Sequence, residues 1–122
     1  MVEIKRDGGG LGEGWSFDGL WLRPDDAMRR PFLCEGDEVY EHELPSSPFW
    51  TFDGSALQRS DALAPAWLVL DGLLRRAGVS DPSWHFTGTE LRQMGSDATD
   101  CWRASDRVPL VVIACAAGLC RS

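Results

Sequence analysis

Five of the ten residues in EGDEVYEHEL, residues 35–44, are carboxylates, and such a density of acids can serve several kinds of chemistry. The acidic residues are Glu35, Asp37, Glu38, Glu41 and Glu43. Carboxylates can hold a metal ion, imitate the phosphates of a nucleic acid, or keep the edge strand of a sheet solvated and unpaired. The calcium-binding EF-hand pattern is absent, because no D-x-[DN]-x-[DN]-G run leads to a glutamate at its twelfth position.

His42 lies within this stretch, but its position argues against a local metal site. In an extended strand, Tyr40 and His42 share one face, and Glu41 and Glu43 share the other. The carboxylates nearest to His42 therefore point away from it, and no metal site is expected. The second histidine, His85, lies between two aromatic residues and is expected to be a hydrogen-bonded strand residue rather than a general base.

No side chain stands in a recognised catalytic context. The serines have no GxSxG motif, and adjacent acids such as Asp25 and Asp26 are expected to face solvent. The glycine-rich run at 8–14 is not followed by GK[ST], so it reads as a link rather than a phosphate-binding loop. The four cysteines, Cys34, Cys101, Cys115 and Cys120, have no CxxC spacing and are expected to be free, mostly buried thiols. The sequence thus predicts a protein that is not an enzyme, with no catalytic residues, no cofactor and no metal.

The net charge of −7 is concentrated in the first third of the chain. Residues 1–43 hold eleven acids and five bases, a net of −6, whereas residues 44–122 hold eight acids and seven bases, a net of −1. Such a protein repels nucleic acid and anionic membranes and attracts a basic partner. No apolar run reaches the roughly 18 residues of a membrane helix, and the N-terminus has no apolar core of a signal peptide, so we expect a cytoplasmic protein.

The first half of this single 122-residue domain reads mainly as strands. Residues 1–45 form an acidic, glycine-rich part in which VEIKR and then WSFDGLWLR, residues 15–23, are each expected to be one strand, the latter with a bulge at Gly19. DEVYEHEL is a further candidate strand. No internal repeat is visible between the two halves.

Residues 60–120 read as a helix, a hairpin and a second helix. Leu63, Trp67, Leu70 and Leu74 recur at helical spacing and predict a helix over 62–77. SWHFTGTEL and CWRAS predict the two strands of an antiparallel hairpin. Ser105 or Asp106 is expected to start the second helix, whose body LVVIACAAGLC carries no charge on any face and must be buried on two sides or make a subunit contact. The predicted fold class is therefore α+β, a mainly antiparallel sheet with two helices packed on it.

This second half resembles the phage ABA-sandwich domain proteins, small proteins of phages and prophages. The resemblance rests on APAWLVLDGLLRRAG as an Ala-Trp helix, DCWRAS as a Trp-bearing last strand, and VPLVVIACAAGL as a helix that opens with Pro-Leu. It covers roughly residues 60–120, and the glycine-rich N-terminal part departs from it. The resemblance implies a mobile-element accessory protein that works in a bacterial host cell.

These observations predict a non-enzymatic phage accessory protein that acts by binding. The most specific form of this prediction is an anti-CRISPR-like inhibitor of a host defence system. Such an inhibitor blocks the basic nucleic-acid-binding surface of a host protein or nucleoprotein complex and does not bind nucleic acid itself. The residues assigned to partner binding are Glu35, Asp37, Glu38, Tyr40, Glu41, Glu43 and Trp50, with Phe49 as a further aromatic anchor.

Two alternatives remain open at this point. The protein could sequester a nucleotide signal, because bases stack on aromatic side chains. Phosphate binding would then need arginines such as Arg23, Arg29, Arg30 or Arg103 to converge. Alternatively, it could be a virion or assembly component that forms oligomers through the apolar C-terminal helix.

Overall fold

The computed structural model describes residues 1–7, 14–26, 31–40, 49–95 and 100–119. In the first half the strands are β1 (Val2–Arg6), β2 (Trp15–Phe17), β3 (Trp21–Pro24), β4 (Phe32–Glu35), β5 (Glu38–Tyr40) and β6 (Phe49–Phe52). In the second half they are β7 (Ala56–Arg59), β8 (Trp67–Leu70), β9 (Leu73–Arg76), β10 (Trp84–Phe86), β11 (Glu90–Gln93) and β12 (Cys101–Ala104). Helix α1 (Leu110–Ala116) follows the last strand.

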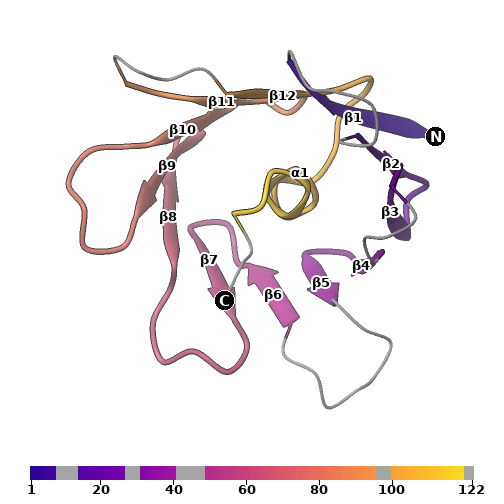
Figure 1. Ribbon diagram of the computed structural model, residues 1–122. Helices are drawn as coiled ribbons and strands as arrows, with labels where there is room; N and C mark the ends of the chain where they lie inside the picture. Colours follow the sequence, from indigo (N-terminus) through magenta and orange to yellow (C-terminus); the bar gives the residue numbers. More distant parts are fainter. Residues whose placement is uncertain (8–13, 27–30, 41–48, 96–99, 120–122) are drawn as a thin grey trace.

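The strands close into an antiparallel barrel in which each strand pairs with its neighbours in the chain. Strand β12 pairs with β1 and joins the two ends of the sheet, with Ile4 opposite Ala104 and Arg6 opposite Trp102. Figure 1 shows the strands following one another around a ring. Each described strand therefore has a partner on both sides, and the closed sheet offers no free edge to another chain.

Helix α1 lies in the middle of this ring (Figure 1). All of its residues are buried, and Ile113 at its centre is 0% exposed. Side chains alone just fill a barrel of about eight strands, so a wider barrel needs additional material inside, which α1 supplies. The expectation of a buried apolar helix is confirmed, although the helix starts at Leu110 rather than at Ser105 or Asp106. Within the described residues, no helix is long and apolar enough to cross a lipid bilayer.

One inward-facing position recurs on the second strand of successive hairpins. The residues that occupy it are 0 or 1% exposed: Leu22, Val39, Leu57, Leu74 and Leu91. Successive members are 17, 18, 17 and 17 residues apart. Ile4 of β1, also 0% exposed, completes the ring around the helix. The chain therefore contains a hairpin repeat, which corrects the expectation of no internal repeat.

The predicted fold class, α+β with two helices on a sheet, is wrong. The segment 62–77, predicted as a helix, contains the β8–β9 hairpin. Leu63 and Leu70, which belong to the apparent helical stripe, are 105% and 75% exposed, so the stripe does not pack as one face. Trp67 and Leu74 are buried because they face the inside of the barrel from two different strands.

The chain reverses between β8 and β9 at Asp71 and Gly72. Their φ angles are 52° and 79°, the two positive values that a two-residue type I′ hairpin turn requires. Asp-Gly is the preferred sequence for this turn. The hairpin signal therefore lay inside the segment that periodicity assigned to a helix.

Two further segments predicted as single strands are also hairpins. Residues 15–23 turn at Gly19 between β2 and β3, and residues 83–91 turn at Gly88 between β10 and β11. The strand predicted at VEIKR is confirmed as β1, and CWRAS supplies β12, which returns antiparallel to β11. Of DEVYEHEL, Asp37 lies in the turn before β5, Glu38–Tyr40 form β5, and the rest is outside the described residues.

The cysteines behave as expected where they are described. Cys34, Cys101 and Cys115 are buried and form no disulfide bond with one another, and Cys120 lies outside the described residues. Buried thiols of this kind act as small apolar side chains, so they add to the core and not to a reactive site.

Candidate functional site

The turns that follow the even-numbered strands all lie at one end of the barrel, because neighbouring strands run antiparallel. These turns are residues 18–20, 36–37, 53–55, 71–72 and 87–89, together with 105–109, which leads from β12 into α1. This end is termed the turn end. The opposite end, which includes the connections 60–66 and 77–83, is termed the loop end.

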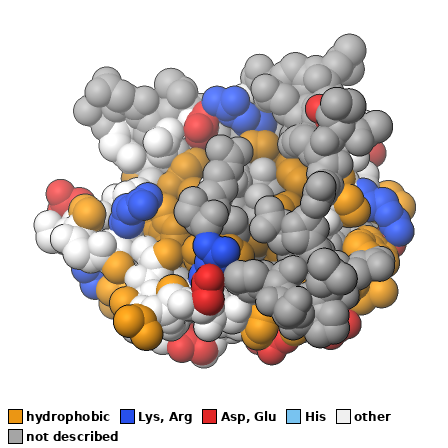
Figure 2. Space-filling view, turned by 60° about the horizontal axis from the view of Figure 1, so that its bottom comes forward, with side chains coloured by type: hydrophobic (Ala, Val, Ile, Leu, Met, Phe, Trp, Pro, Cys, Tyr) orange, Lys and Arg blue, Asp and Glu red, His pale blue; other side chains and the backbone are white. Residues whose placement is uncertain are grey.

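Carboxylates gather at the turn end. Those within the turns or directly beside them are Asp18, Glu35, Asp37, Glu38, Asp53, Asp71, Glu90 and Asp106. Arg107 is the one basic side chain at the same set of described positions. In Figure 2, several acidic side chains lie along the lower edge, while charges of both signs are scattered among hydrophobic side chains elsewhere on that face. The acidic end is thus built by many hairpins and not by one stretch of sequence.

Sequence reasoning missed the acids contributed by the second half of the chain. Asp53, Asp71, Glu90 and Asp106 lie outside EGDEVYEHEL, in the part of the chain after residue 43, whose net charge is only −1. The signal that could have found most of them is the recurrence of a glycine after a short polar residue at the hairpin turns. Once these turns are recognised as one repeat, the acids beside them fall at the same end of a sheet.

Two of the turn-end carboxylates hold their own turns together. Oδ1 of Asp18 accepts hydrogen bonds from the backbone N–H groups two and three residues further on, at 2.9 and 2.7 Å. Oδ1 of Asp53 does the same in its turn, with both distances 2.9 Å. These backbone hydrogen bonds lower the pKa of Asp18 and of Asp53, because they favour the ionised carboxylate. The negative charge of both residues therefore supports folding.

The acids of the β4–β5 turn do not support folding in this way. Glu35 and Glu38 lie directly opposite each other on the two strands, and Asp37 lies in the turn between them. Like charges at directly opposed positions destabilise an antiparallel pair, by roughly 0.2–1 kcal/mol. Among the described residues, neither Glu35 nor Asp37 has an ion-pair partner. The charge at this turn therefore weakens the hairpin that carries it.

Tyr40 lies beside these carboxylates on the outer face of the barrel, since Val39 next to it points inward. Its hydroxyl donates a hydrogen bond to the Glu38 carboxylate, and this bond raises the pKa of Tyr40 to about 12. Its ring packs on that of Phe49 with the ring centres 4.7 Å apart. An aromatic pair next to carboxylates offers charge together with a flat apolar contact. Glu35, Asp37, Glu38, Tyr40 and Phe49 are termed the acidic–aromatic face.

Other residues assigned to this surface are placed differently. Trp50 lies opposite the inward-facing Val39 and packs against the buried core, so it is not on the face of Tyr40. Glu41 and Glu43 lie outside the described residues, as does His42. The interpretation of the stretch as a solvated edge strand is wrong for β5, because β5 pairs with both β4 and β6.

The other candidate chemistries find no support among the described residues. No three His, Cys, Asp or Glu side chains in this part of the chain are arranged to hold a metal ion. His85 is exposed on β10, opposite Leu73 of β9. The arrangement that the barrel does assemble, carboxylates beside an aromatic pair, can make contacts with a basic surface.

Two substitutions with opposite effects test which carboxylates serve folding. We expect Glu35→Gln to raise the free energy of unfolding at pH 7, by up to about 1 kcal/mol, because it removes the repulsion across the β4–β5 pair. We expect Asp53→Ala to lower it. The pKa of Asp53 is depressed in the folded state, so its stabilising contribution is complete above its ordinary value of 3.8 and is lost as the pH falls through the folded pKa. Urea unfolding at pH 7 and at about pH 2.5 measures both effects.

For Asp53→Ala, the difference from the wild-type protein should therefore shrink at the lower pH. A Glu35→Gln variant that is less stable than the wild type at pH 7 would show that Glu35 has a structural role, contrary to this interpretation.

The fold and this surface define a class of protein: a closed antiparallel barrel with an internal helix and a cluster of acidic side chains at one end. Comparison of the chain with protein-family models, curated proteins and solved structures finds no match. The resemblance to phage ABA-sandwich domain proteins rested on a helix–hairpin–helix order over residues 60–120. The described residues of that part form the strands β8–β12 and one helix, and the phage origin stays a prediction.

Proposed function

We propose that the protein acts by binding and not by catalysis, and that its acidic–aromatic face occupies a basic surface of a partner protein. The observation that carries this proposal is Glu35 opposite Glu38 with Asp37 between them, a group of like charges that weakens its own hairpin. Proteins tend to break the rules of stable design at their functional sites. A repulsive cluster that a partner's cations would neutralise fits this pattern.

The rest of the turn end supports the same reading. The other carboxylates at this end, including the turn-capping Asp18 and Asp53, add a negative field that steers a cationic partner towards the face. Tyr40 and Phe49 supply an aromatic contact of the kind that dominates binding energy at interfaces. Arginine-rich surfaces that normally hold phosphates suit such a face, because arginine binds a carboxylate and a phosphate with the same two-pronged geometry.

The proposed activity is inhibition by occupation of a nucleic-acid-binding surface. A phage-encoded, anti-CRISPR-like inhibitor of a host defence complex is one instance, and this narrower form and a cytoplasmic location stay predictions. The alternative of a virion component assumed that the C-terminal helix is available for contacts between subunits. Every residue of α1 is buried inside its own barrel, so the helix presents no surface to a second subunit.

Charge reversal at the β4–β5 turn tests the proposal. In affinity capture from a bacterial lysate, we expect Glu35→Lys/Asp37→Lys to reduce recovery of the bound partner at least tenfold relative to wild type, about 1.4 kcal/mol. Wild-type capture should also weaken when the salt concentration rises from about 50 to about 300 mM, because exposed charges are screened. Quantitative mass spectrometry of the captured proteins is the measurement.

Asp37→Lys and Asp81→Lys provide the matched control. Both residues are exposed and both substitutions change the net charge equally, but Asp81 lies at the loop end. We expect only Asp37→Lys to reduce capture. Equal losses from the two variants would show that net charge alone matters, and no loss from Glu35→Lys/Asp37→Lys would show that the face is not the contact.

A further inference from the structure

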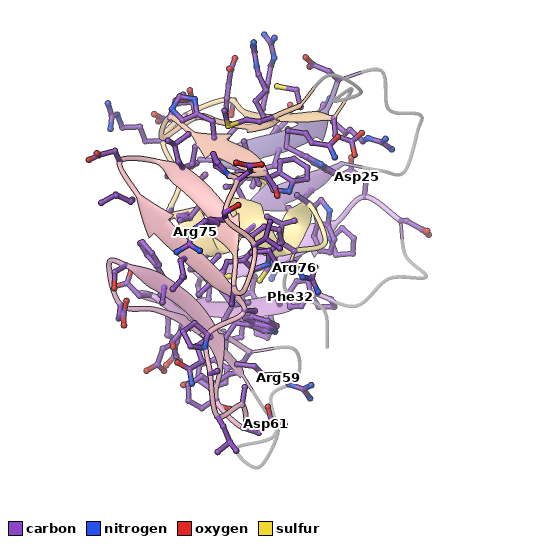
Figure 3. All side chains as sticks on the ribbon, turned by 90° about the vertical axis from the view of Figure 1, so that its left-hand side faces the viewer. Asp25, Phe32, Arg59, Asp61, Arg75 and Arg76 are labelled. Atoms are coloured by element: carbon purple, nitrogen blue, oxygen red, sulfur yellow. The ribbon has the colours of Figure 1, made fainter. Side chains whose placement is uncertain are left out.

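At the loop end, the inner face of the barrel changes from apolar to cationic. On β7, Leu57 is fully buried, and Arg59, two residues further on, lies on the same face of the strand. On β9, Leu74 and Arg76 are related in the same way. Figure 3 shows Arg59 and Arg76 towards the same end of the barrel. Two arginines therefore project from the inner wall at this end.

Each of these arginines lies opposite a tryptophan of the preceding strand. Trp50 of β6 is opposite Arg59, and Trp67 of β8 is opposite Arg76. The guanidinium carbon of Arg76 is 5.7 Å from the centre of the Trp67 ring, a cation–π contact. Leu57, and not Arg59, lies opposite Trp67, so Arg59 is two residues further along β7 than the position level with Arg76. With neighbouring strands about 4.8 Å apart and a rise of about 3.3 Å per residue, the two arginines start roughly 12 Å from each other, with Trp67 on the strand between them.

The two guanidinium groups are not neutralised to the same extent. Nε of Arg59 is 3.1 Å from Oδ1 of Asp61, but the Asp61 side chain is 53% exposed, and such surface pairs contribute little free energy. Among the described residues, no carboxylate forms an ion pair with Arg76. The guanidinium groups of Arg59 and Arg76 therefore keep positive charge that can bind an anion.

The arginines expected from the sequence to bind phosphate are not the ones that converge. Arg23 and Arg103 lie on the outer surface, each paired with a carboxylate. Arg29 and Arg30 lie outside the described residues. Only the pairing register of the barrel brings Trp50, Arg59, Trp67 and Arg76 onto one inner surface.

We propose that Trp50, Arg59, Trp67 and Arg76 form a binding site for a nucleoside phosphate. Guanidinium groups bind phosphate oxygens in a two-pronged geometry, and the half-buried ring of Trp50 can stack on a base. Trp67, buried beneath Arg76, holds that guanidinium in position. A net charge of −7 disfavours a long nucleic acid relative to a single nucleotide, because each added phosphate adds repulsion.

Titration calorimetry of the full chain with ADP, adenosine and pyrophosphate tests this site. We expect saturable binding of ADP below about 1 mM, the upper end of ordinary metabolite affinities, and at least tenfold weaker binding of adenosine and of pyrophosphate. Arg76→Gln should weaken ADP binding at least tenfold, and Arg59→Gln should also weaken it. Far-UV circular dichroism establishes that each variant is folded.

Arg75→Gln is the matched control, because Arg75 is adjacent in sequence but lies on the opposite face of β9, where Nη1 donates to the carbonyl of Val79 at 2.9 Å. This variant should bind ADP like the wild type. Three results would each overturn the proposal. They are no binding of ADP at about 1 mM, equal losses of ADP affinity in Arg75→Gln and Arg76→Gln, and tighter binding of oligo-dT than of ADP. Glu35→Lys/Asp37→Lys should leave ADP binding unchanged, so this site and the acidic–aromatic face are tested independently.

Discussion

Replacing Ile113 with aspartate is expected to prevent the barrel from forming. Ile113 lies in the centre of α1, is 0% exposed and is surrounded by the inward-facing side chains of the barrel wall. An unpaired carboxylate at this position loses its hydration and gains no partner, which costs several kcal/mol. The whole stability of a small domain is about 5–15 kcal/mol, so the loss is of comparable size. We expect little soluble protein and a far-UV circular dichroism spectrum without native strand signal.

A milder pair of substitutions keeps this prediction measurable where the aspartate variant fails to fold. Ile113→Ala should lower the free energy of unfolding by about 2–5 kcal/mol, because it leaves a cavity in the core. Leu63→Ala is the control, since Leu63 is 105% exposed and its truncation should change stability by less than about 0.5 kcal/mol. Equal effects in urea unfolding would contradict the placement of α1 in the core.

The central helix is the part of the fold that sequence could predict. The segment from Leu110 to Ala116 has no charged residue, so no side of a helix formed by it can face water. That argument needs only the local sequence and holds whatever surrounds the helix. The same is true of β1, whose alternation of Val2 and Ile4 on one face survives in the barrel.

The closed barrel could not be read from any single segment. Its strands are three to five residues long, so each gives periodicity only one or two inward positions to detect. Over such short spans, the spacing of Trp67, Leu70 and Leu74 fits a helix as well as two strands. The decisive signals are the Asp71–Gly72 turn and the 17- or 18-residue spacing of the buried ring, which appear only when hairpins are compared with one another.

Only the part of the candidate site that consists of neighbouring acidic residues in the sequence could be predicted. The clustering of Glu35, Asp37 and Glu38 is visible in the sequence, and the barrel keeps these acids together at one turn. Which aromatic residues join them depends on strand register, and a shift of one residue moves a side chain to the other face. Trp50 is opposite Val39 and therefore points inward, while Phe49 is opposite Tyr40 and points outward.

Gly72→Ala is expected to be among the most damaging single-methyl additions to the chain. A Cβ at this position would lie 2.5 Å from the backbone carbonyl oxygen of Phe86, and a backbone atom cannot move aside as a flexible side chain can. The same stretch carries a hydrogen bond from the Phe86 N–H to the Gly72 carbonyl, 2.7 Å long, which docks the β8–β9 turn on β10. The φ of Gly72 is 79°, and any residue other than glycine would be strained at this angle as well. We expect a loss of at least about 3 kcal/mol in urea unfolding.

Gly36→Ala separates the two causes of this loss. Gly36 also has a positive φ, 60°, but a Cβ built on it meets no atom within 4 Å, so only the backbone strain of roughly 1–2 kcal/mol applies. A clearly larger loss for Gly72→Ala than for Gly36→Ala would therefore measure the contact between adjacent hairpins. Equal losses of unfolding free energy in the two variants would mean that β10 moves to make room for the added methyl group. Closure of the barrel would then not depend on the close contact between Gly72 and Phe86. The approach of Gly72 to Phe86 joins two adjacent hairpins, so it is one of the contacts by which the hairpin repeat closes into a ring.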